Sequence, residues 1–237
     1  MLGAAALAMW WDMAPELRAE FEHWHSHEHF AERLALPGFL RGSRWVDSAG
    51  GESFFILYEL SAYEALVSPE YLACLNAPSD WSRRMMPHHR NMVRSPCRVL
   101  ASRGGAVAGH ALTVRLSPRP EAQAALRQHL ADKVERLPLA PGITGAHLLC
   151  TEVPQIAATT EQKLRGHSDR AADWVVLVQG YQAEALDGLA GGALSPAALQ
   201  AAGAREDVTS GRYSLRLSMV AGEPLRVHAL GSPRASD

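Results

Sequence analysis

The residues most capable of chemistry gather in the segment 21–33, which reads FEHWHSHEHFAER. As a single helix, this segment has an apolar stripe that passes through Trp24 and places Glu28 where a core residue is expected. Burial raises the pKa of a carboxyl toward the range of a general base. We therefore predict that His29 is a general acid or base, that Glu28 orients it, and that Arg33 holds the anion of a substrate. The alternative is a set of surface ion pairs beside a satisfied histidine.

The same segment contains four histidines at alternate positions, which would form a metal-binding tract in an extended chain. On a helix, His25 and His29 share one face, His23 and His27 share another, and the two pairs point apart. A pair four residues apart needs further ligands from elsewhere to hold a metal. We therefore predict no metal site.

A second cluster, residues 81–94, reads WSRRMMPHHRNMVR. Helical spacing places one histidine, His88, beside a face of tryptophan and methionine, which favours a second acid or base next to an apolar pocket. The alternative is that the apolar residues are core and the arginines are solvated. The residues predicted to bind the substrate across both clusters are Arg33, Arg84, Trp24, Trp81, Met85 and His89.

The order of predicted elements is strand, helix, strand, strand, helix, strand, and it occurs twice. A Pro-Gly pair ends the first helix of each half, at 37–38 and 141–142, 104 residues apart. We predict an α+β fold with two tandem ferredoxin-like units, 1–105 and 106–220, followed by a tail, 221–237. The expected strands are 2–11, 40–47, 53–60, 97–103, 110–116, 144–150, 174–181 and 212–219. The expected helices are 15–36, 62–76, a broken piece at 79–92, 121–137, and 183–202 with a glycine break.

The two units differ in ways that bear on the site. The later strands, 54–60 and 175–181, are 121 rather than 104 residues apart, so the second unit carries 17 extra residues within the segment 151–172. A loop of that length is often functional, and we expect Lys163 or Arg165 to reach a pocket rim. The positions that correspond to Glu28 and His29 hold an aspartate and a lysine, so we expect one working pocket, in the first unit.

Composition excludes several classes of protein. The chain has 23 basic and 25 acidic residues, a net charge of −2 and no long basic run, which argues against nucleic acid or an anionic membrane as partner. Its cysteines, Cys74, Cys97 and Cys150, are too few for a disulfide framework, so we expect a cytoplasmic protein. No glycine-rich nucleotide fingerprint follows a predicted strand.

The repeated βαββαβ order, the helix motif Trp24-x-x-x-Glu28-His29-x-x-Glu32-Arg33 before Pro37-Gly38-Phe39, and the segment 83–92 resemble the dimeric α+β barrel superfamily. Within it, the chain looks like a tandem-repeat, uncharacterised bacterial branch of the EthD-like proteins. The resemblance is specific over residues 1–105 and only architectural over 106–220. It implies that the two units form, within one chain, the barrel that other members form as dimers.

The superfamily includes cofactor-free monooxygenases, polyketide cyclases, muconolactone isomerases and haem enzymes, so the fold alone selects no reaction. We expect lyase, isomerase or cyclase-type acid–base chemistry on a small aromatic or polyketide-like carbonyl compound, without an organic cofactor; monooxygenase chemistry is also open. The alternatives are a haem protein with His167 or His88 as axial ligand, and a non-catalytic ligand-binding or assembly module. A homodimer is possible.

Overall fold

The computed structural model describes residues 1–166 and 169–222, and it contains eight strands that form one closed antiparallel barrel. Most strands bury both faces, because one face lines the barrel and the other packs under helices. The strands are β1 (Ala5–Asp12), β2 (Phe39–Asp47), β3 (Ser53–Leu60), β4 (Arg90–Arg103), β5 (His110–Leu116), β6 (Ile143–Thr151), β7 (Trp174–Gly180) and β8 (Thr209–Val220).

The strand order around the barrel is β1-β3-β2-β8-β5-β7-β6-β4. Each unit contributes four neighbouring strands, and the units join where β2 pairs with β8 and β4 pairs with β6. At the first seam Ser43 lies opposite Ser218, and their hydroxyls are 3.0 Å apart. Every sheet edge is therefore paired. The prediction of two tandem ferredoxin-like units that form an intrachain dimeric α+β barrel is confirmed.

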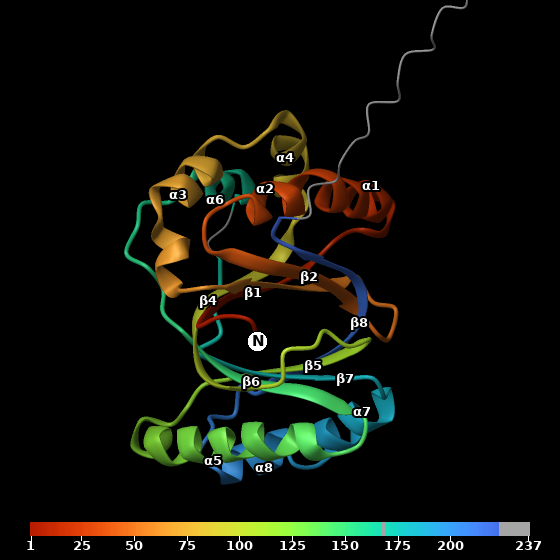
Figure 1. Ribbon diagram of the computed structural model, residues 1–237, viewed down its shortest axis with the longest axis vertical. Coiled ribbons are helices and arrows are strands. Elements are labelled where there is room, and N and C mark those ends of the chain that lie inside the picture. The colour runs from red at the N-terminus through yellow and green to blue at the C-terminus, as the bar shows by residue number, and fades with distance from the viewer. Residues whose placement is uncertain (167–168, 223–237) are drawn as a thin grey trace, which may run out of the picture.

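Helices cover the barrel on two opposite sides (Figure 1). Over the first unit lie η1 (Pro15–Leu17), α1 (Arg18–Trp24), η2 (His25–His29), α2 (Phe30–Leu34), η3 (Tyr63–Val67), α3 (Pro69–Asn76), α4 (Asp80–Met85) and η4 (Met86–His88). Over the second lie η5 (Pro120–Ala122), α5 (Gln123–Arg136), η6 (Leu137–Leu139), α7 (Ala183–Gly191) and α8 (Pro196–Ala201). The helix α6 (Thr160–Arg165) comes from the second unit but lies among the helices of the first (Figure 1). No helix in the described part of the chain is long and apolar enough to cross a membrane.

The core has three parts. One fills the barrel, around the stacked rings of Trp10, Phe55 and Trp45. The other two lie between each half of the barrel and its helices. The core under the first unit is rich in aromatic rings, whereas the core under the second is mainly leucine and valine.

Two differences between the predicted elements and the structure bear on the site. The strand expected from residue 97 begins at Arg90, because the preceding residues also pair with β1, and Pro96 is tolerated there opposite Leu7. The segment 151–172 was expected to be irregular, but it contains α6, which begins with a capping box between Thr159 and Gln162. The predicted tail lies almost entirely outside the described residues.

Candidate functional site

The first helix of the chain contains one turn of π-helix, η2, in which the Phe30 N–H donates to the His25 carbonyl five residues back. A π turn adds one residue relative to an α-helix and rotates the residues that follow it. The buried face therefore passes from Trp24 to His29 and Arg33 instead of through Glu28. The predicted core position of Glu28 is wrong for this reason.

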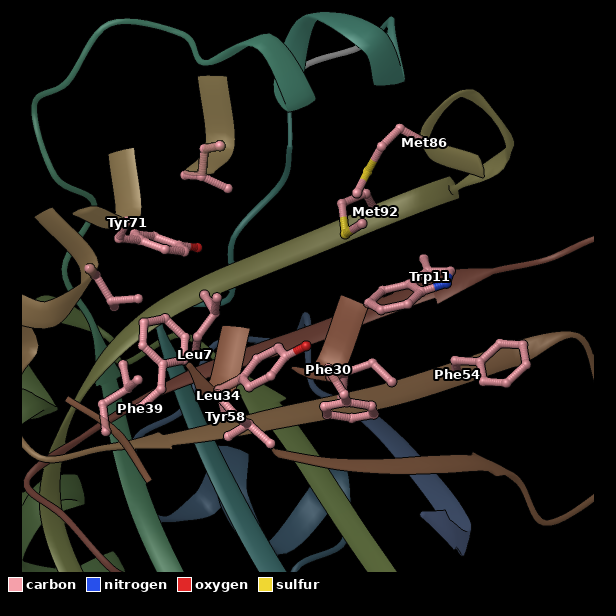
Figure 2. Close-up of a cluster of buried hydrophobic side chains, with 14 of the residues drawn as sticks. Leu7, Trp11, Phe30, Leu34, Phe39, Phe54, Tyr58, Tyr71, Met86 and Met92 are labelled. Atoms are coloured by element: carbon pink, nitrogen blue, oxygen red, sulfur yellow. The ribbon is translucent and has the colours of Figure 1, made fainter. Parts of the chain in front are cut away.

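A small cavity of ≈ 50 Å³ lies between the outer face of the first half-barrel and its helices. Figure 2 shows part of its wall, with Trp11 on β1, Tyr71 on α3, and Met86 and Met92 on either side of the turn into β4. The cavity is lined by Leu7, Met9, Trp11, His25, His29, Arg33, Tyr58, Tyr71, Leu75, Met86, His89, Met92, Arg94, Ile156, Thr159, Glu161, Gln162 and Arg165. Its wall is apolar and aromatic, with imidazole and guanidinium groups set into it.

Three buried imidazoles, those of His25, His29 and His89, line this cavity. The rings of His25 and His29 are 5.4 Å apart, and Trp11 lies 6.0 Å from His25 and 4.8 Å from His89. Burial, with a smaller effect of nearby guanidinium groups, holds the pKa of His25 and of His29 well below the usual value. Burial and Arg165 lower the pKa of His89 to about 3. All three imidazoles are therefore neutral at physiological pH.

The hydrogen bonds of these rings define what each can do. His89 Nδ1 is 3.1 Å from the Met85 carbonyl and 3.2 Å from the Met86 carbonyl, so this nitrogen carries the hydrogen. His29 Nδ1 lies 3.8 Å from a carboxylate oxygen of Glu32, whose pKa is raised by burial. The acidic group nearest to His29 Nδ1 is thus Glu32, whereas Glu28 was predicted to orient this ring.

Several buried polar atoms at the cavity make no hydrogen bond within the described residues. They include Nδ1 of His25, Nδ1 of His29, the Tyr58 hydroxyl and Nε1 of Trp11. Buried polar atoms are paired in the great majority of cases, and a cluster without partners marks a place where water or a ligand supplies them. Burial also raises the pKa of Tyr58, which keeps its phenol protonated as a donor.

Three guanidinium groups surround the same space. Arg33 pairs with Glu161, and both side chains are buried. Arg165 pairs with Asp169 at 3.1 and 2.6 Å. Arg94 donates to the Tyr71 hydroxyl at 3.0 Å and has no carboxylate within ion-pair distance among the described residues. Of these three cations, Arg94 is thus the one that no carboxylate neutralises within ion-pair distance among the described residues.

The structure brings some of the predicted residues together and separates others. Of these, His29, Arg33 and His89 line the cavity. Glu28 instead accepts from Trp24 Nε1 at 3.1 Å and from the Ser79 hydroxyl at 2.5 Å, on another side of the helix.

The predicted residues of the second cluster mostly lie away from the cavity. His88 and Arg84 are exposed, because η4 turns the chain so that the next histidine faces inward. Trp81 donates to Glu20 on the surface. Met85 and Trp24 are core residues behind the wall, although the Trp24 ring lies 4.5 Å from that of His29.

Sequence reasoning missed Tyr58 and Trp11, and it did not select Arg94 from the second cluster as a site residue; all three lie on strands. Their signal is only visible once the strand register places them on the helix-covered face. The expectation that the inserted segment supplies Arg165 to a pocket is confirmed, and Lys163 lines the adjoining hollow.

The residues present do not favour a metal or haem at the inner cavity. Among the described residues no group of His, Cys, Asp or Glu has a metal-binding arrangement. Pockets for drug-sized ligands measure about 300–1,000 Å³, so with α6 in place the cavity of ≈ 50 Å³ does not hold a porphyrin. Of the two suggested axial ligands, His88 is exposed and does not line this cavity, and His167 lies outside the described residues.

Comparison with known proteins supports the fold. No protein-family model matches the chain, and no curated protein matches its sequence. An anthrone oxidase-like protein has a similar solved structure, with a TM-score of 0.65 and 12% identity over 94% of this chain and 95% of that one. Two structures named “putative monooxygenase” are also similar. The one from Fusobacterium nucleatum subsp. nucleatum has a TM-score of 0.62 and 8% identity over 93% of this chain and 96% of that one. The one from Lactobacillus acidophilus NCFM has a TM-score of 0.57 and 10% identity over 93% and 97%. At such identities the likeness establishes the dimeric α+β barrel fold and no more.

Proposed function

We propose that the cavity of the first unit is the active site of a small-molecule enzyme that removes a proton from an aromatic or polyketide-like carbonyl compound. The observation that carries this proposal is the neutral His29 imidazole in an apolar cavity, with Nδ1 toward Glu32 and guanidinium groups nearby. A base, a group that orients it, and a cation for the developing anion are the parts that such chemistry requires.

In the proposed reaction, His29 Nε2 takes a proton from the carbon next to the substrate carbonyl. The electron pair of the broken C–H bond moves onto the carbonyl oxygen, and Arg94 stabilises the resulting enolate. Glu32 accepts a hydrogen bond from Nδ1–H when the imidazole becomes cationic, as orienting carboxylates do for catalytic histidines. The rings of Trp11 and Tyr58 supply the apolar surface that binds an aromatic substrate.

The enolate then has several outcomes. Return of the proton from His29 to another carbon gives isomerisation, loss of a leaving group gives elimination, and reaction with O₂ gives oxidation. We propose lyase or isomerase chemistry without an organic cofactor in a cytoplasmic, EthD-like protein. The names of the similar structures make the oxidative outcome the second candidate. An oxygen electrode separates the two, since only oxidation consumes O₂, and absorbance near 400 nm of the purified protein tests for haem.

The test of the site is a screen of aromatic carbonyl compounds followed by substitution of the base. We expect His29→Ala to lower kcat/KM by about 10²-fold or more, the usual contribution of a general base. The matched control is His27→Ala, an exposed histidine on the same helix, which should keep full activity. Circular dichroism confirms that both variants are folded. A folded His29→Ala variant with wild-type kcat/KM would remove His29 as the base.

The pH profile gives a second readout. Because burial lowers the pKa of His29, its imidazole stays neutral below pH 6.5. We expect kcat/KM to stay level between pH 6 and 8, whereas a base with the ordinary histidine pKa of about 6.5 would lose activity through this range.

A further inference from the structure

The helix α6 closes the cavity with a carboxylate. Glu161 on α6 pairs with Arg33 on α2, and the two side chains are 5% and 3% exposed. A second anchor lies beside it, where Asn76 at the end of α3 accepts from the Thr160 N–H at 3.0 Å and from its hydroxyl at 3.4 Å. A helix inserted in the second unit is thus held by polar contacts against the helices of the first.

The inner cavity, on one side of α6, is too small for an aromatic substrate, whereas the adjoining hollow on its other side is large enough. The inner cavity measures ≈ 50 Å³, and the adjoining hollow measures ≈ 600 Å³. Arg94 and Gln162 line both, so Gln162 on α6 forms part of the wall that separates them. A ligand with an aromatic ring needs several times the inner volume. Movement of α6, which carries Gln162, would join the two spaces and make room for such a ligand.

The charges at this wall indicate what kind of ligand moves it. With α6 in place, Arg33 is neutralised by Glu161 in a buried position. A buried guanidinium that loses its carboxylate is strongly unfavourable unless another anion replaces it. A neutral ligand that displaced α6 would leave Arg33 without a counter-charge. An anionic ligand would supply one.

We propose that α6 is a cover over the active site and that the Glu161 carboxylate occupies the place on Arg33 that an anionic group of the substrate takes. The substrate class is thus an aromatic carbonyl compound that also bears a carboxylate. This inference rests on the proposed function for the location of the site, but its binding step does not depend on turnover. The covered form binds no substrate, so the apparent affinity is lowered by the fraction of molecules that are open.

The test uses benzoate and its neutral counterpart benzamide as probes, with binding followed by calorimetry and by the intrinsic tryptophan fluorescence, to which Trp11 in the cavity wall contributes. We expect Glu161→Gln to bind benzoate at least tenfold more tightly than the wild type, as holds if fewer than about one molecule in ten is open. We also expect the melting temperature of Glu161→Gln to lie below that of the wild type without ligand and to recover when benzoate is added. Benzamide should neither bind the variant more tightly than the wild type nor restore its melting temperature. The matched control is Glu135→Gln, which removes an exposed ion pair between Glu135 on α5 and Arg103 on β4 and should change neither quantity.

A measurement on the wild type keeps the proposal testable if Glu161→Gln fails to fold. The amide of Thr160 donates to Oδ1 of Asn76 across the contact between α6 and α3, so this hydrogen bond breaks when α6 moves away. Saturating benzoate should speed hydrogen exchange at this amide, and benzamide should not. Unchanged or slower exchange with benzoate, or a Glu161→Gln variant that binds benzoate no better than the wild type, would overturn the proposal. A chain that binds benzoate as expected but turns over no carbonyl compound would refute the proposed function and leave this inference standing.

Discussion

Acid should destabilise this protein partly through His89, and the contribution of this residue can be isolated by one substitution. Its pKa is about 3 in the folded protein, mainly because the ring is buried, and the nearby Arg165 adds to the effect. An unfolded histidine titrates near 6.5, so below that pH the unfolded chain binds a proton that the folded chain does not. Stability contributed by the neutral ring is therefore complete above pH 6.5 and is lost as the pH falls toward 3.

The size of the effect follows from the shift. At pH 5.0 the solution lies 1.5 units below the unfolded pKa, and at about 1.4 kcal/mol per unit His89 costs about 2 kcal/mol. His25 and His29 act in the same direction. His147, whose pKa burial also lowers to about 3, adds a similar amount at the barrel. Since small proteins are stable by only about 5–15 kcal/mol, acid unfolding near pH 5 is expected.

The assay is urea unfolding followed by tryptophan fluorescence at pH 7.5 and 5.0. The variant His89→Asn keeps a donor for the Met85 and Met86 carbonyls but does not titrate. We expect it to lose about 2 kcal/mol less unfolding free energy than the wild type between the two pH values. The control His88→Asn changes the exposed neighbouring histidine, and it should lose as much unfolding free energy as the wild type between the two pH values. Equal losses in all three proteins would show that His89 is not held neutral.

Two further predictions concern packing and unpaired hydroxyls. In Gly42→Ala the new Cβ would lie 2.3 Å from the Phe30 ring, so we expect urea unfolding to show a loss of about 1–3 kcal/mol in unfolding free energy. In the control Gly105→Ala the new Cβ meets nothing within 4 Å, and the unfolding free energy should not change. Equal effects of the two substitutions would contradict this prediction. Tyr58→Phe removes a buried hydroxyl without a partner and should leave stability unchanged or slightly higher. Tyr71→Phe removes the hydroxyl that accepts a hydrogen bond from Arg94, and it should lower the unfolding free energy by about 1–2 kcal/mol. If Tyr58→Phe proved the more destabilising of the two variants, the hydrogen-bond assignment would be refuted.

The order of strands and helices was predictable because each element has a pattern that involves residues close together in the chain. The alternation in the strands and the repeated Pro-Gly pair at residues 37–38 and 141–142 identify the two units, and each pattern involves neighbours in the chain. The barrel seams are different, since a pairing such as Ser43 with Ser218 joins residues 175 apart and leaves no local signal. Their existence followed only from the resemblance to a known superfamily.

The site was only partly predictable, for a physical reason that starts at η2. Periodicity assumes 3.6 residues per turn throughout a helix, so a single π turn moves every later residue to another face. This shift brought His29 and Arg33 into the cavity and sent Glu28 toward Ser79. Arg94 was not selected because the strand that carries it was expected to begin only at residue 97.

The two units differ in how the first long helix of each packs on its sheet, and the histidine-lined cavity lies under the helices of the first unit. In α5 of the second unit, Leu126, Leu130 and Val134 follow a regular four-residue spacing and pack against the sheet without a π turn. The position equivalent to Glu28 is the exposed Asp132. The second unit therefore closes its own helix–sheet interface with aliphatic side chains, and its inserted α6 reaches across to the first unit. In a chain whose units are covalently joined, one copy can keep a polar cavity while the other provides both the rest of the barrel and the cover. An arrangement of two identical subunits would place the same insert and the same cavity in each.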